Sequence, residues 1–463
     1  MPVIDPSTGE QIGVIADGAA HHVDAAVQAA RAALELGPWS RFNGGDREAL
    51  LRKLADLMER DRDLLADLEA MDAGMPLWMA RELNIPSAIA SFRFMAGLAS
   101  KTNGRTVPVH TPIPNSGYFG YTQREPVGVV GAIIPWNVPV MLAAWKLAPA
   151  LATGCTVVLK PSEEASCAVL HLTRLVAEAG FPPGVVNVIT GRGATVGAAL
   201  AGHPGIDKIT FTGSTRTGKQ IARAAAENST RVTLELGGKS AQILCADADL
   251  DRAIEGISNS IFLHSGQICV SGSRLYVHRS IYAEVQERLT KHANALKVGA
   301  ALAPDTQIGP LVNRRQQDQV LRYIDEAKEQ GAKVLTASYR VDAPGYFVRP
   351  TVAVVEDQSA RIVREEVFGP VLAVAAFDDE EQAVSLANDS PYGLAASVWT
   401  RNLSAMHSIV PKLRVGKVSV NNEPMPYPTL PDGGRKASGY GRDMGDESFD
   451  SYLETKAVIV RYA

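Results

Sequence analysis

One cysteine of the sequence stands in a setting that favours chemistry over packing. Cys269 lies in the segment 265–274, where glycine and serine residues surround it directly after the apolar run 261–263. Small neighbours give up buried apolar area, so packing alone rarely selects them beside a core position. A nucleophilic thiol needs them, because a substrate must reach the sulfur with backbone close by. The segment alone also permits a buried, inert cysteine, since free cysteine is among the most buried residue types.

A carboxylate occupies an equally unusual place earlier in the chain. Glu235 stands between two leucines in an apolar strand, directly before Gly237 and Gly238. Burying a glutamate there is unfavourable unless the carboxyl group is paired or protonated. Glu235 is therefore a candidate general base, and a structural ion pair is the alternative.

Polar side chains mark the ends of two further apolar strands. Asn137 follows the strand 127–134, where it either caps the next helix or donates its amide N–H to an oxyanion. Lys160 and Glu163 follow the strand 156–160, at the edge where open α/β sheets bind ligands. A solvated loop is the alternative for this second pair.

The segment 209–218 has the pattern of a phosphate site. Its apolar strand runs into Gly213 and Ser214, which open a helix. A helix N-terminus offers free N–H groups and the positive end of its dipole to a pyrophosphate. The glycine fingerprint usual for dinucleotide sites is absent from this turn, and the nearby run 191–197 misses its spacing by one residue.

The composition is that of a globular protein large enough for about two or three domains. The chain has 463 residues, is 46% hydrophobic and 21% charged, and has a formal net charge of −4. Lys and Arg are scattered, so we expect no nucleic-acid or anionic-membrane partner. The four cysteines form no disulfide framework, and the start of the chain lacks a signal-peptide pattern, so we expect a reducing cytoplasm.

The stretch 126–145 contains no charged residue and is long enough to cross a bilayer. However, Pro135, Asn137 and Pro139 break any single helix there. We interpret the stretch as a buried strand, a sharp turn and the start of a helix, and expect no membrane span.

The order of the predicted elements indicates an α/β fold. Between residues 127 and 245 apolar strands alternate with helices, as is typical of a parallel sheet. The pattern restarts after Cys269 and predicts a second α/β region. Helical spacing in the amino-terminal part predicts helices at 24–36, 46–72 and 82–99.

Six motifs in chain order resemble those of the aldehyde dehydrogenase superfamily, and the resemblance covers essentially the whole chain. Their number and spacing make coincidence implausible. The motifs are Pro135-Trp136-Asn137, Lys160-Pro161-Ser162-Glu163, Phe211-Thr212-Gly213-Ser214, Glu235-Leu236-Gly237-Gly238-Lys239, Gly266-Gln267-Ile268-Cys269 and Glu366-Val367-Phe368-Gly369-Pro370.

The resemblance implies a mechanism that the residues independently support. The Cys269 thiolate attacks an aldehyde carbon, and the Asn137 amide and the Cys269 N–H hold the oxyanion. Hydride transfer to a nicotinamide leaves a thioester on the cysteine. Glu235 then activates the water that releases the carboxylic acid.

The resemblance also implies NAD as the cofactor, with NADP as a second acceptor. Lys160 and Glu163 resemble the adenosine-ribose contacts, Ser214 a pyrophosphate contact, and Glu366 and Phe368 the nicotinamide-side contacts. We expect preference for NAD, because a carboxylate accepts from the ribose 2′-OH and repels a 2′-phosphate. No metal ligand is predicted. The full set of predicted cofactor contacts is Ile133, Pro135, Trp136, Lys160, Ser162, Glu163, Gly193, Gly197, Phe211, Gly213, Ser214, Leu236, Glu366 and Phe368.

The chain departs from the family pattern before its last Gly-Gly pair, where Asp432 stands in place of the aromatic residue of many members. Two other functions are alternatives to hydrolytic aldehyde oxidation. A semialdehyde dehydrogenase that acylates coenzyme A does not depend on the glutamate base, as the resemblance implies, so Glu235 favours hydrolysis. A non-catalytic family member is disfavoured because Cys269, Glu235 and Asn137 are all present.

The resemblance and the element order together predict three structural units and an assembly. Extended segments outside the α/β cores, with turn residues at 114–117, predict a protruding hairpin whose unpaired edge invites pairing with another chain. In relatives such elements join subunits, which implies a homodimer or homotetramer. The predicted units are a Rossmann-like NAD-binding domain (1–107 and 126–237), an α/β catalytic domain (238–450) and a small β oligomerisation element (108–125 and 451–463).

Overall fold

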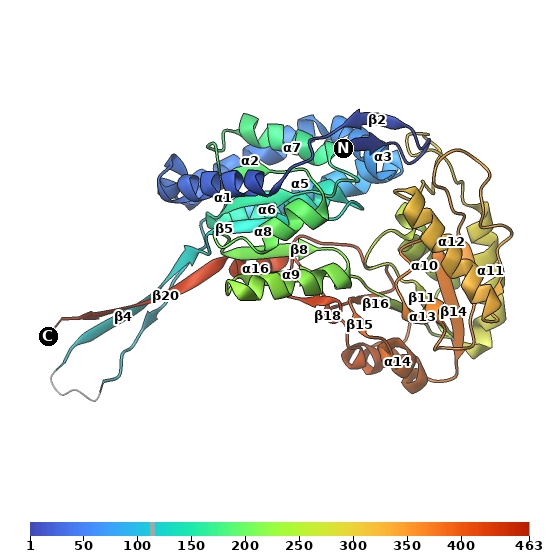
Figure 1. Ribbon diagram of the computed structural model, residues 1–463. Coiled ribbons are helices and arrows are strands. Elements are labelled where there is room, and N and C mark those ends of the chain that lie inside the picture. The colour runs from blue at the N-terminus through green and yellow to red at the C-terminus, as the bar shows by residue number, and fades with distance from the viewer. Residues whose placement is uncertain (112–115, 463) are drawn as a thin grey trace.

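The computed structural model describes residues 1–111 and 116–462. Two α/β bodies lie side by side, and a narrow arm projects from the first of them (Figure 1). Each body is built around one large sheet, and this confirms the α/β fold class expected from the alternation of strands and helices.

The first body is built on a six-stranded sheet. Its central strands are buried on both faces, which explains their near-continuous apolar sequence. Five strands run parallel, and β19 pairs antiparallel with β9. The spatial order is β19 (Gly439–Tyr440), β9 (Arg231–Glu235), β8 (Lys208–Thr212), β5 (Val129–Ile133), β6 (Thr156–Lys160) and β7 (Val186–Val188).

The chain order of this sheet reverses between β5 and β8. Ile133 pairs with Lys160 on one side and with Phe211 on the other, and Thr212 pairs with Glu235. The polar segments that follow four strands therefore leave the sheet at one edge. A reversal of strand order is where open α/β sheets bind ligands, in the crevice beyond their carboxyl ends.

Helices cover both faces of the first sheet. The prediction of one continuous helix over 46–72 is wrong, because the chain forms two helices there. The first, α2, ends before Asp61, and the second, α3, begins after it. The Asp61 carboxylate contacts the Arg60 guanidinium and His171 Nε2, both at 2.7 Å, so a charged contact sits at the break. The helices of this body are α1 (Ala20–Glu35), α2 (Gly44–Arg60), α3 (Arg62–Ala73), α4 (Leu77–Met79), α5 (Ile85–Ala96), α6 (Pro139–Thr153), α7 (Cys167–Ala179), α8 (Ala198–Ala201), α9 (Thr215–Glu227) and α16 (Gly445–Ser451).

Two further predictions concern the amino-terminal half of the chain. The helix expected from Glu82 starts earlier, as α4 and the π-helical turn η2 (Ala80–Asn84), and continues as α5. The uncharged stretch 126–145 forms β5, a turn and the first part of α6, as predicted. Across residues 1–111 and 116–462, no helix combines the length and the hydropathy needed to cross a bilayer.

The second body is built on a seven-stranded sheet, parallel except for β12. Helices α10 (Leu250–Phe262), α11 (Tyr282–Ala295), α12 (Arg314–Glu329), α13 (Arg361–Arg364), α14 (Glu380–Asn388) and α15 (Leu403–Ile409) belong to this half of the chain. The spatial order is β12 (Lys333–Val334), β13 (Thr351–Val354), β14 (Val371–Phe377), β11 (Arg274–His278), β10 (Ala241–Leu244), β16 (Ala395–Trp399) and β17 (Lys417–Val420).

Two small sheets complete these bodies. The strands β1 (Pro2–Ile4) and β2 (Gln11–Val14) form an antiparallel hairpin at the start of the chain. The strands β15 (Tyr392–Gly393) and β18 (Arg435–Lys436) pair next to the second body.

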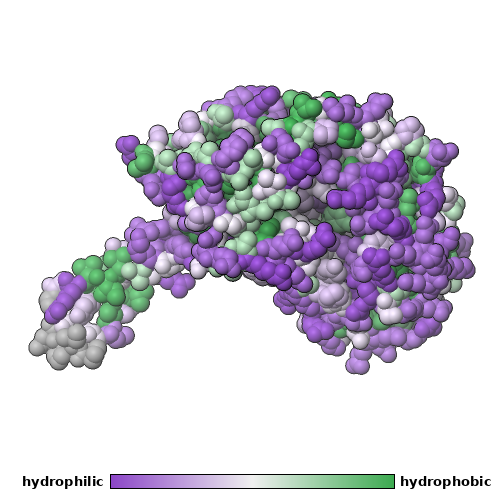
Figure 2. All heavy atoms as spheres, in the orientation of Figure 1, coloured by the Kyte–Doolittle hydropathy of each residue, from purple (hydrophilic) through white to green (hydrophobic). Residues whose placement is uncertain are grey.

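The arm is a three-stranded antiparallel sheet, with β20 and β3 on either side of β4. Its strands are β3 (Thr106–Val107), β4 (Tyr118–Pro126) and β20 (Leu453–Arg461). Residues 114 and 115 of the predicted turn lie outside the described residues. Hydrophobic side chains gather on the arm (Figure 2). Those exposed there are Val107, Phe119, Ile459, Val460 and Tyr462.

Candidate active site

A cavity of about 1080 Å³ lies between the two bodies. Segments that follow β5, β8 and β9 of the first sheet form one side, and the loop before β11 of the second sheet forms another. In the described part of the chain, no group of three or more His, Cys, Asp or Glu side chains is placed to hold a metal ion. Predicted residues that line the cavity are Pro135, Trp136, Asn137, Gly213, Ser214, Glu235, Leu236, Cys269, Glu366 and Phe368.

The loop that carries Cys269 has a backbone conformation that few residues adopt. Residues 264–266 have φ angles of 49°, 55° and 70° in succession. The left-handed region costs a non-glycine residue roughly 1–2 kcal/mol. At Gly266 the restriction is also steric, because a Cβ there would lie 2.1 Å from the carbonyl oxygen of Gly369. Backbone strain of this kind persists only where the surrounding structure enforces it. The strained turn lies directly before the residues that lead to Cys269, which lines the cavity.

The buried side chain of Gln267 holds this loop in place. Its Oε1 accepts from the Val312 N–H at 2.9 Å, and its Nε2 donates to the His264 carbonyl at 3.1 Å. Its own carbonyl accepts from Asn137 Nδ2 at 2.8 Å. One N–H of the Asn137 amide is therefore tied to the loop that carries Cys269, which fixes the orientation of that amide.

Glu235 lies at the carboxyl end of β9 and is 9% exposed. Its Oε1 has no hydrogen-bond partner among the described residues. Burial raises the pKa of this carboxyl well above its usual value, the negative charges of Asp443 and Asp432 raise it further, and the Lys146 ammonium opposes them. A Cβ on Gly433 would lie 2.5 Å from Oε1, so only glycine fits beside it. An unpaired oxygen with a raised pKa suits a group that accepts a proton.

The thiol of Cys269 is half-buried among negative charges. Burial raises its pKa, and the carboxylates of Asp432, Glu366 and Glu235 raise it further, against a smaller opposing effect of the Val270 N–H. The protein without ligand therefore holds Cys269 as a thiol at neutral pH. Because the thiolate is the nucleophile, the reaction must remove this proton.

The electrostatic effect of Glu366 on the thiol predicts a pH-dependent reactivity. Burial raises the pKa of Glu366 to about 7, so its charge is present above that pH and lost below it. The variant Glu366→Gln lacks this charge and should have a lower thiol pKa, with a gain of up to about tenfold in thiolate for each pKa unit. Iodoacetamide should therefore alkylate Cys269 several-fold faster in the variant at pH 8–9.

At pH 6, where Glu366 is neutral, the two alkylation rates should converge. Cys269→Ala measures background labelling of the other cysteines, and Glu365→Gln, at the exposed neighbouring position, is the matched control. Equal rates for wild type and Glu366→Gln across pH 6–9 would contradict this electrostatic coupling.

Aromatic and carboxyl groups form the side of the cavity next to Gly237 and Gly238. The rings of Trp136 and Phe368 meet edge to face, with centroids 5.4 Å apart. Glu366 Oε1 accepts from the Gly238 N–H at 3.1 Å. A Cβ on Gly237 would lie 2.0 Å from Glu366 Oε2, so glycine at this position is required for this close approach.

Lys160, Glu163, Gly193 and Gly197 form a separate cluster beyond the carboxyl end of β6, outside the residues that line the cavity. Lys160 Nζ lies 3.3 Å from Glu163 Oε2, and Glu163 Oε1 accepts from the Gly193 N–H at 3.3 Å. Gly197 adjoins the Lys160 stem, since a Cβ there would be 3.6 Å from Cδ. Burial raises the pKa of Glu163, but the N–H groups of Glu163 and Gly193 and the Lys160 ammonium together hold it below its usual value. Ser162 lies in the same turn.

The remaining predicted residues lie where β5 and β8 meet α9. Ile133 and Phe211 are paired across the two strands. The Phe211 ring packs so closely on Gly213 that a Cβ there would lie 2.5 Å from it. Ser214 caps α9, and its Oγ accepts a backbone N–H of the first turn at 3.3 Å. The Leu236 side chain packs against that same turn of α9.

Sequence reasoning missed the charged groups around Glu235. Lys146 and Asp443 form an ion pair whose side chains are both almost completely buried, although they are 297 residues apart in the chain. Asp432 was recognised only as a departure from a pattern, and it pairs with Lys417 at 2.7 Å. No local spacing signals these pairs, because their members come from separate elements.

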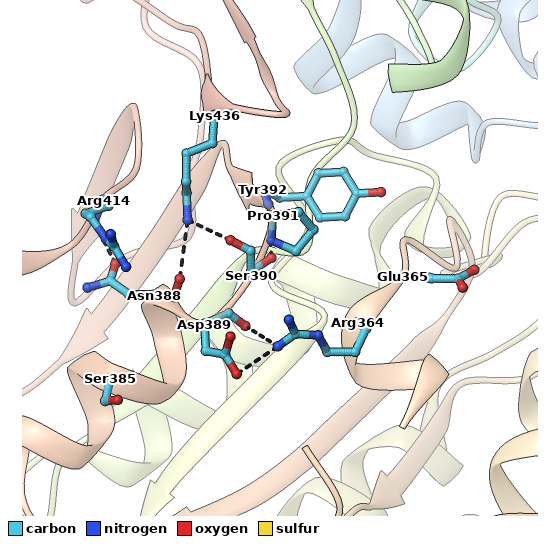
Figure 3. A pocket seen from close by; sticks show the side chains of 10 residues that line it. All are labelled: Arg364, Glu365, Ser385, Asn388, Asp389, Ser390, Pro391, Tyr392, Arg414 and Lys436. Atoms are coloured by element: carbon cyan, nitrogen blue, oxygen red, sulfur yellow. Dashed lines mark hydrogen bonds and ion pairs between the residues drawn. The ribbon is translucent and has the colours of Figure 1, made fainter. Parts of the chain in front are cut away.

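A second hollow, of about 960 Å³, lies on the surface of the second body, and no predicted site residue lines it. Figure 3 shows its polar lining. Lys436 Nζ donates to the carbonyl oxygens of Ser390 and Asn388 at 2.8 and 3.3 Å. Arg364 pairs with Asp389 at 2.8 Å. These cations already have acceptors from the protein.

The chain has two large sheets, a crevice where the strand order of the first sheet reverses, and a cavity that contains a thiol. Together these features define an α/β enzyme. Residues 1–458 match the Aldehyde dehydrogenase family. The chain therefore belongs to the aldehyde dehydrogenase family, as the six motifs indicated.

Individual relatives agree with this assignment along the whole chain. The mitochondrial aldehyde dehydrogenase of Sus scrofa is 44% identical over 463 residues, which cover 100% of this chain and 88% of that protein. Retinal dehydrogenase 2 of Homo sapiens is 42% identical over 463 residues, with the same coverage of 100% and 88%. The solved NAD+ complex of aldehyde dehydrogenase from Bacillus cereus has a TM-score of 0.97 at 45% identity, and covers 100% of this chain and 93% of that chain.

Proposed function

We propose that the protein oxidises an aldehyde to the carboxylic acid, with NAD as the hydride acceptor. The observation that carries this proposal is that Cys269, Asn137 and Glu235 line one cavity together with Glu366 and Phe368. A thiol, an amide donor and an unpaired carboxyl are the groups that nucleophilic attack, oxyanion binding and hydrolysis require. The Bacillus cereus relative, solved as an NAD+ complex, supports the cofactor.

The first half of the reaction takes place on Cys269. The thiol gives its proton to water, and the resulting thiolate attacks the aldehyde carbon, so that the electron pair of the C=O bond moves to the oxygen and forms an oxyanion. The Asn137 amide donates one N–H to Gln267 and keeps the second for this oxyanion, beside the Cys269 N–H. Bound NAD supplies the hydride acceptor, and loss of the hydride leaves a thioester on the sulfur.

The second half requires a base for water, and Glu235 is placed for it. Its unpaired Oε1 can take a proton from water without breaking a bond to the protein. The attack of water on the thioester then releases the acid and restores the thiol. This group favours hydrolysis over transfer of the acyl group to coenzyme A.

The predicted cofactor contacts fit the parts of a dinucleotide. The cluster of Lys160 and Glu163 offers a cation and a carboxylate to a ribose hydroxyl. The start of α9 at Ser214 offers backbone N–H groups to a pyrophosphate. Trp136 and Phe368 offer aromatic surface on the cavity side, where the nicotinamide must approach the thiol.

The direct experiment is to measure NADH formation from a panel of aldehydes, with and without coenzyme A. We expect NADH in both cases and the free carboxylic acid as product. Acyl-coenzyme A as the main product, or no NADH from any aldehyde, would overturn the proposal.

The carboxylate of Glu163 should select NAD over NADP. Two like charges about 4 Å apart repel by roughly 4 kcal/mol at an effective dielectric of about 20, although Lys160 offsets part of this. Glu163→Gln keeps an acceptor for the Gly193 N–H and removes the charge. The ratio of kcat/KM for NAD to that for NADP should therefore fall roughly tenfold or more in the variant.

The neighbouring variant Glu164→Gln is the matched control and should keep the wild-type ratio. A wild-type kcat/KM for NADP equal to or above that for NAD would refute the preference. An unchanged ratio in Glu163→Gln would show that another residue selects the cofactor.

We also propose the three units named above as domains. The two large sheets support the division, since β9 ends at Glu235 and β10 begins at Ala241. The stretch 439–440, from the proposed catalytic domain, crosses back to pair with β9. All four cysteines are free, which supports a reducing, cytoplasmic location.

The exposed apolar surface of the arm supports a homodimer or homotetramer. Ile459 and Tyr462 are 66% and 70% exposed, and such surface on a projecting sheet marks an interaction site. Light scattering at micromolar concentration should give a multimeric mass, and Ile459→Glu should shift it towards the monomer. Leu403→Glu, at an exposed apolar position of α15 away from the arm, should leave it unchanged. A monomeric wild type would refute the assembly.

A further inference from the structure

The proposed reaction leaves one buried carboxylate of the cavity unused. Glu235 and Asp432 both line the cavity, with exposed fractions of 9% and 8%. Glu235 has a role towards water, whereas no step above needs Asp432. A carboxylate is expensive to bury, so its place beside the reacting groups calls for an explanation.

The position of the Asp432 carboxylate is tightly fixed. Its Oδ2 accepts from Lys417 Nζ, at the start of β17, at 2.7 Å. Its backbone N–H and carbonyl exchange hydrogen bonds of 2.7 and 2.8 Å with Asp443. Its Oδ1 accepts no hydrogen bond from the residues that the structure describes, and 11% of the side chain stays accessible. The carboxylate thus keeps an acceptor atom free.

This acceptor lines the same cavity as the reacting sulfur. The Asp432 charge acts on both the Cys269 thiol and the Glu235 carboxyl, and the next residue, Gly433, touches Glu235 Oε1. Both polar and apolar side chains share the cavity with Asp432. Apolar side chains that line the cavity are Met141, Leu142, Trp145, Leu263, Ile268 and Met425.

A fixed acceptor in the cavity wall discriminates between substrates. An alkyl group that displaces water from Asp432 would leave Oδ1 of its carboxylate without a donor, and a buried acceptor without a hydrogen bond is costly. A hydroxyl group in the same place donates to the carboxylate and avoids that cost. Because Asp432 and Cys269 line the same cavity, one substrate molecule can present its hydroxyl group to Asp432 and its aldehyde carbon to the thiol.

We propose that Asp432 is a specificity-determining residue, and that the substrates are aldehydes with a hydroxyl group on carbon 2 or 3. This inference rests on the proposed function, because it names the substrate class of the same cavity. Lys417 acts as a positioning residue that holds the carboxylate.

The test compares matched aldehydes that differ by one hydroxyl group. NADH formation is measured with 2-hydroxypropanal, 3-hydroxypropanal and propanal, and kcat/KM is expressed per unhydrated aldehyde. Wild type should prefer at least one hydroxyaldehyde by about tenfold to a hundredfold, the range expected of a hydrogen bond to a charged group. Asp432→Asn keeps a neutral acceptor and should retain a smaller preference.

The double variant Asp432→Leu/Lys417→Met removes both members of the ion pair, so no buried ammonium is left alone. Its ratio of kcat/KM for the preferred hydroxyaldehyde to kcat/KM for propanal should fall to about one or below. Glu423→Gln, at another acidic position of the cavity wall, is the matched control and should keep the wild-type ratio. The amplitude of the NADH burst gives the fraction of active enzyme in each preparation.

Three results would overturn the inference. The first is a wild-type kcat/KM for the hydroxyaldehydes that equals that for propanal, and the second is an undiminished preference for them in the double variant. The third is a higher kcat/KM for 3-aminopropanal than for 3-hydroxypropanal. The last result would mean that charge, and not a hydroxyl donor, selects the substrate. In each case NADH still forms, so the proposed function survives. No NADH from any of these aldehydes or from a wider panel would instead refute the proposed function.

Discussion

Replacement of Cys269 by alanine should abolish NADH formation from every aldehyde, with a loss of roughly 10⁴-fold or more. In the proposed mechanism the covalent intermediate forms on this sulfur, and removal of a covalent nucleophile leaves only the contribution of binding. No other cysteine can replace it, since Cys155 and Cys245 are buried and do not line the cavity. Steady-state NADH fluorescence measures the loss, and a thermal shift on adding NAD shows that the variant is folded and binds the cofactor.

The matched control for this variant is Cys167→Ala. Cys167 is also half-buried, but it lies at the start of α7, where its backbone N–H, which alanine keeps, donates to Asp72. We expect wild-type turnover from Cys167→Ala. If Cys269→Ala turned over at the wild-type rate, the thiol chemistry would be wrong.

The part of the fold that positions the site could be predicted because it depends on local sequence. The strand predicted at 156–160 is β6, and the strand predicted at 127–134 contains β5. Apolar strands that alternate with helices pair in parallel, so their carboxyl ends meet at one edge. That single rule brings Asn137, Gly213 and Glu235 to the same cavity.

The break at Asp61 could not be predicted from periodicity. Leucines recur at helical spacing on both sides of it, because α2 and α3 both bury an apolar face. What marks the break is the contact of Asp61 with His171, which lies 110 residues away in α7. A contact with a side chain so distant in the chain leaves no trace in the local pattern.

The electrostatics of the site could not be predicted for the same reason. The raised pKa of Glu235 depends on burial and on Asp443, Asp432 and Lys146. Those groups come from distant parts of the chain: Lys146 of α6 pairs with Asp443, and the stretch 439–440 pairs with β9. The sequence identified the carboxylate, and tertiary packing determines its protonation.

That packing makes Glu235 decisive for the second half of the reaction. With Glu235→Gln we expect a burst of NADH close to one equivalent per active site, followed by turnover slowed roughly 10²–10⁴-fold. Cys269 and Asn137 are untouched, so the thioester still forms, but no carboxylate accepts the proton of the attacking water. Stopped-flow fluorescence resolves the two phases, and intact mass spectrometry should detect the acyl adduct on Cys269.

The pH dependence separates a base from a structural role for Glu235. Because its pKa is raised, the ionised form that accepts a proton is populated only as the pH rises through that raised value. Hydrolysis by wild type should therefore increase with pH, whereas the slow hydrolysis of Glu235→Gln should lack this titration. Glu366→Gln, a carboxyl-to-amide change at a half-buried position of the same cavity, is the control and should keep the pH-dependent hydrolysis. If Glu235→Gln retained wild-type hydrolysis, or lost the burst and the slow phase together, Glu235 would not be the base that activates water.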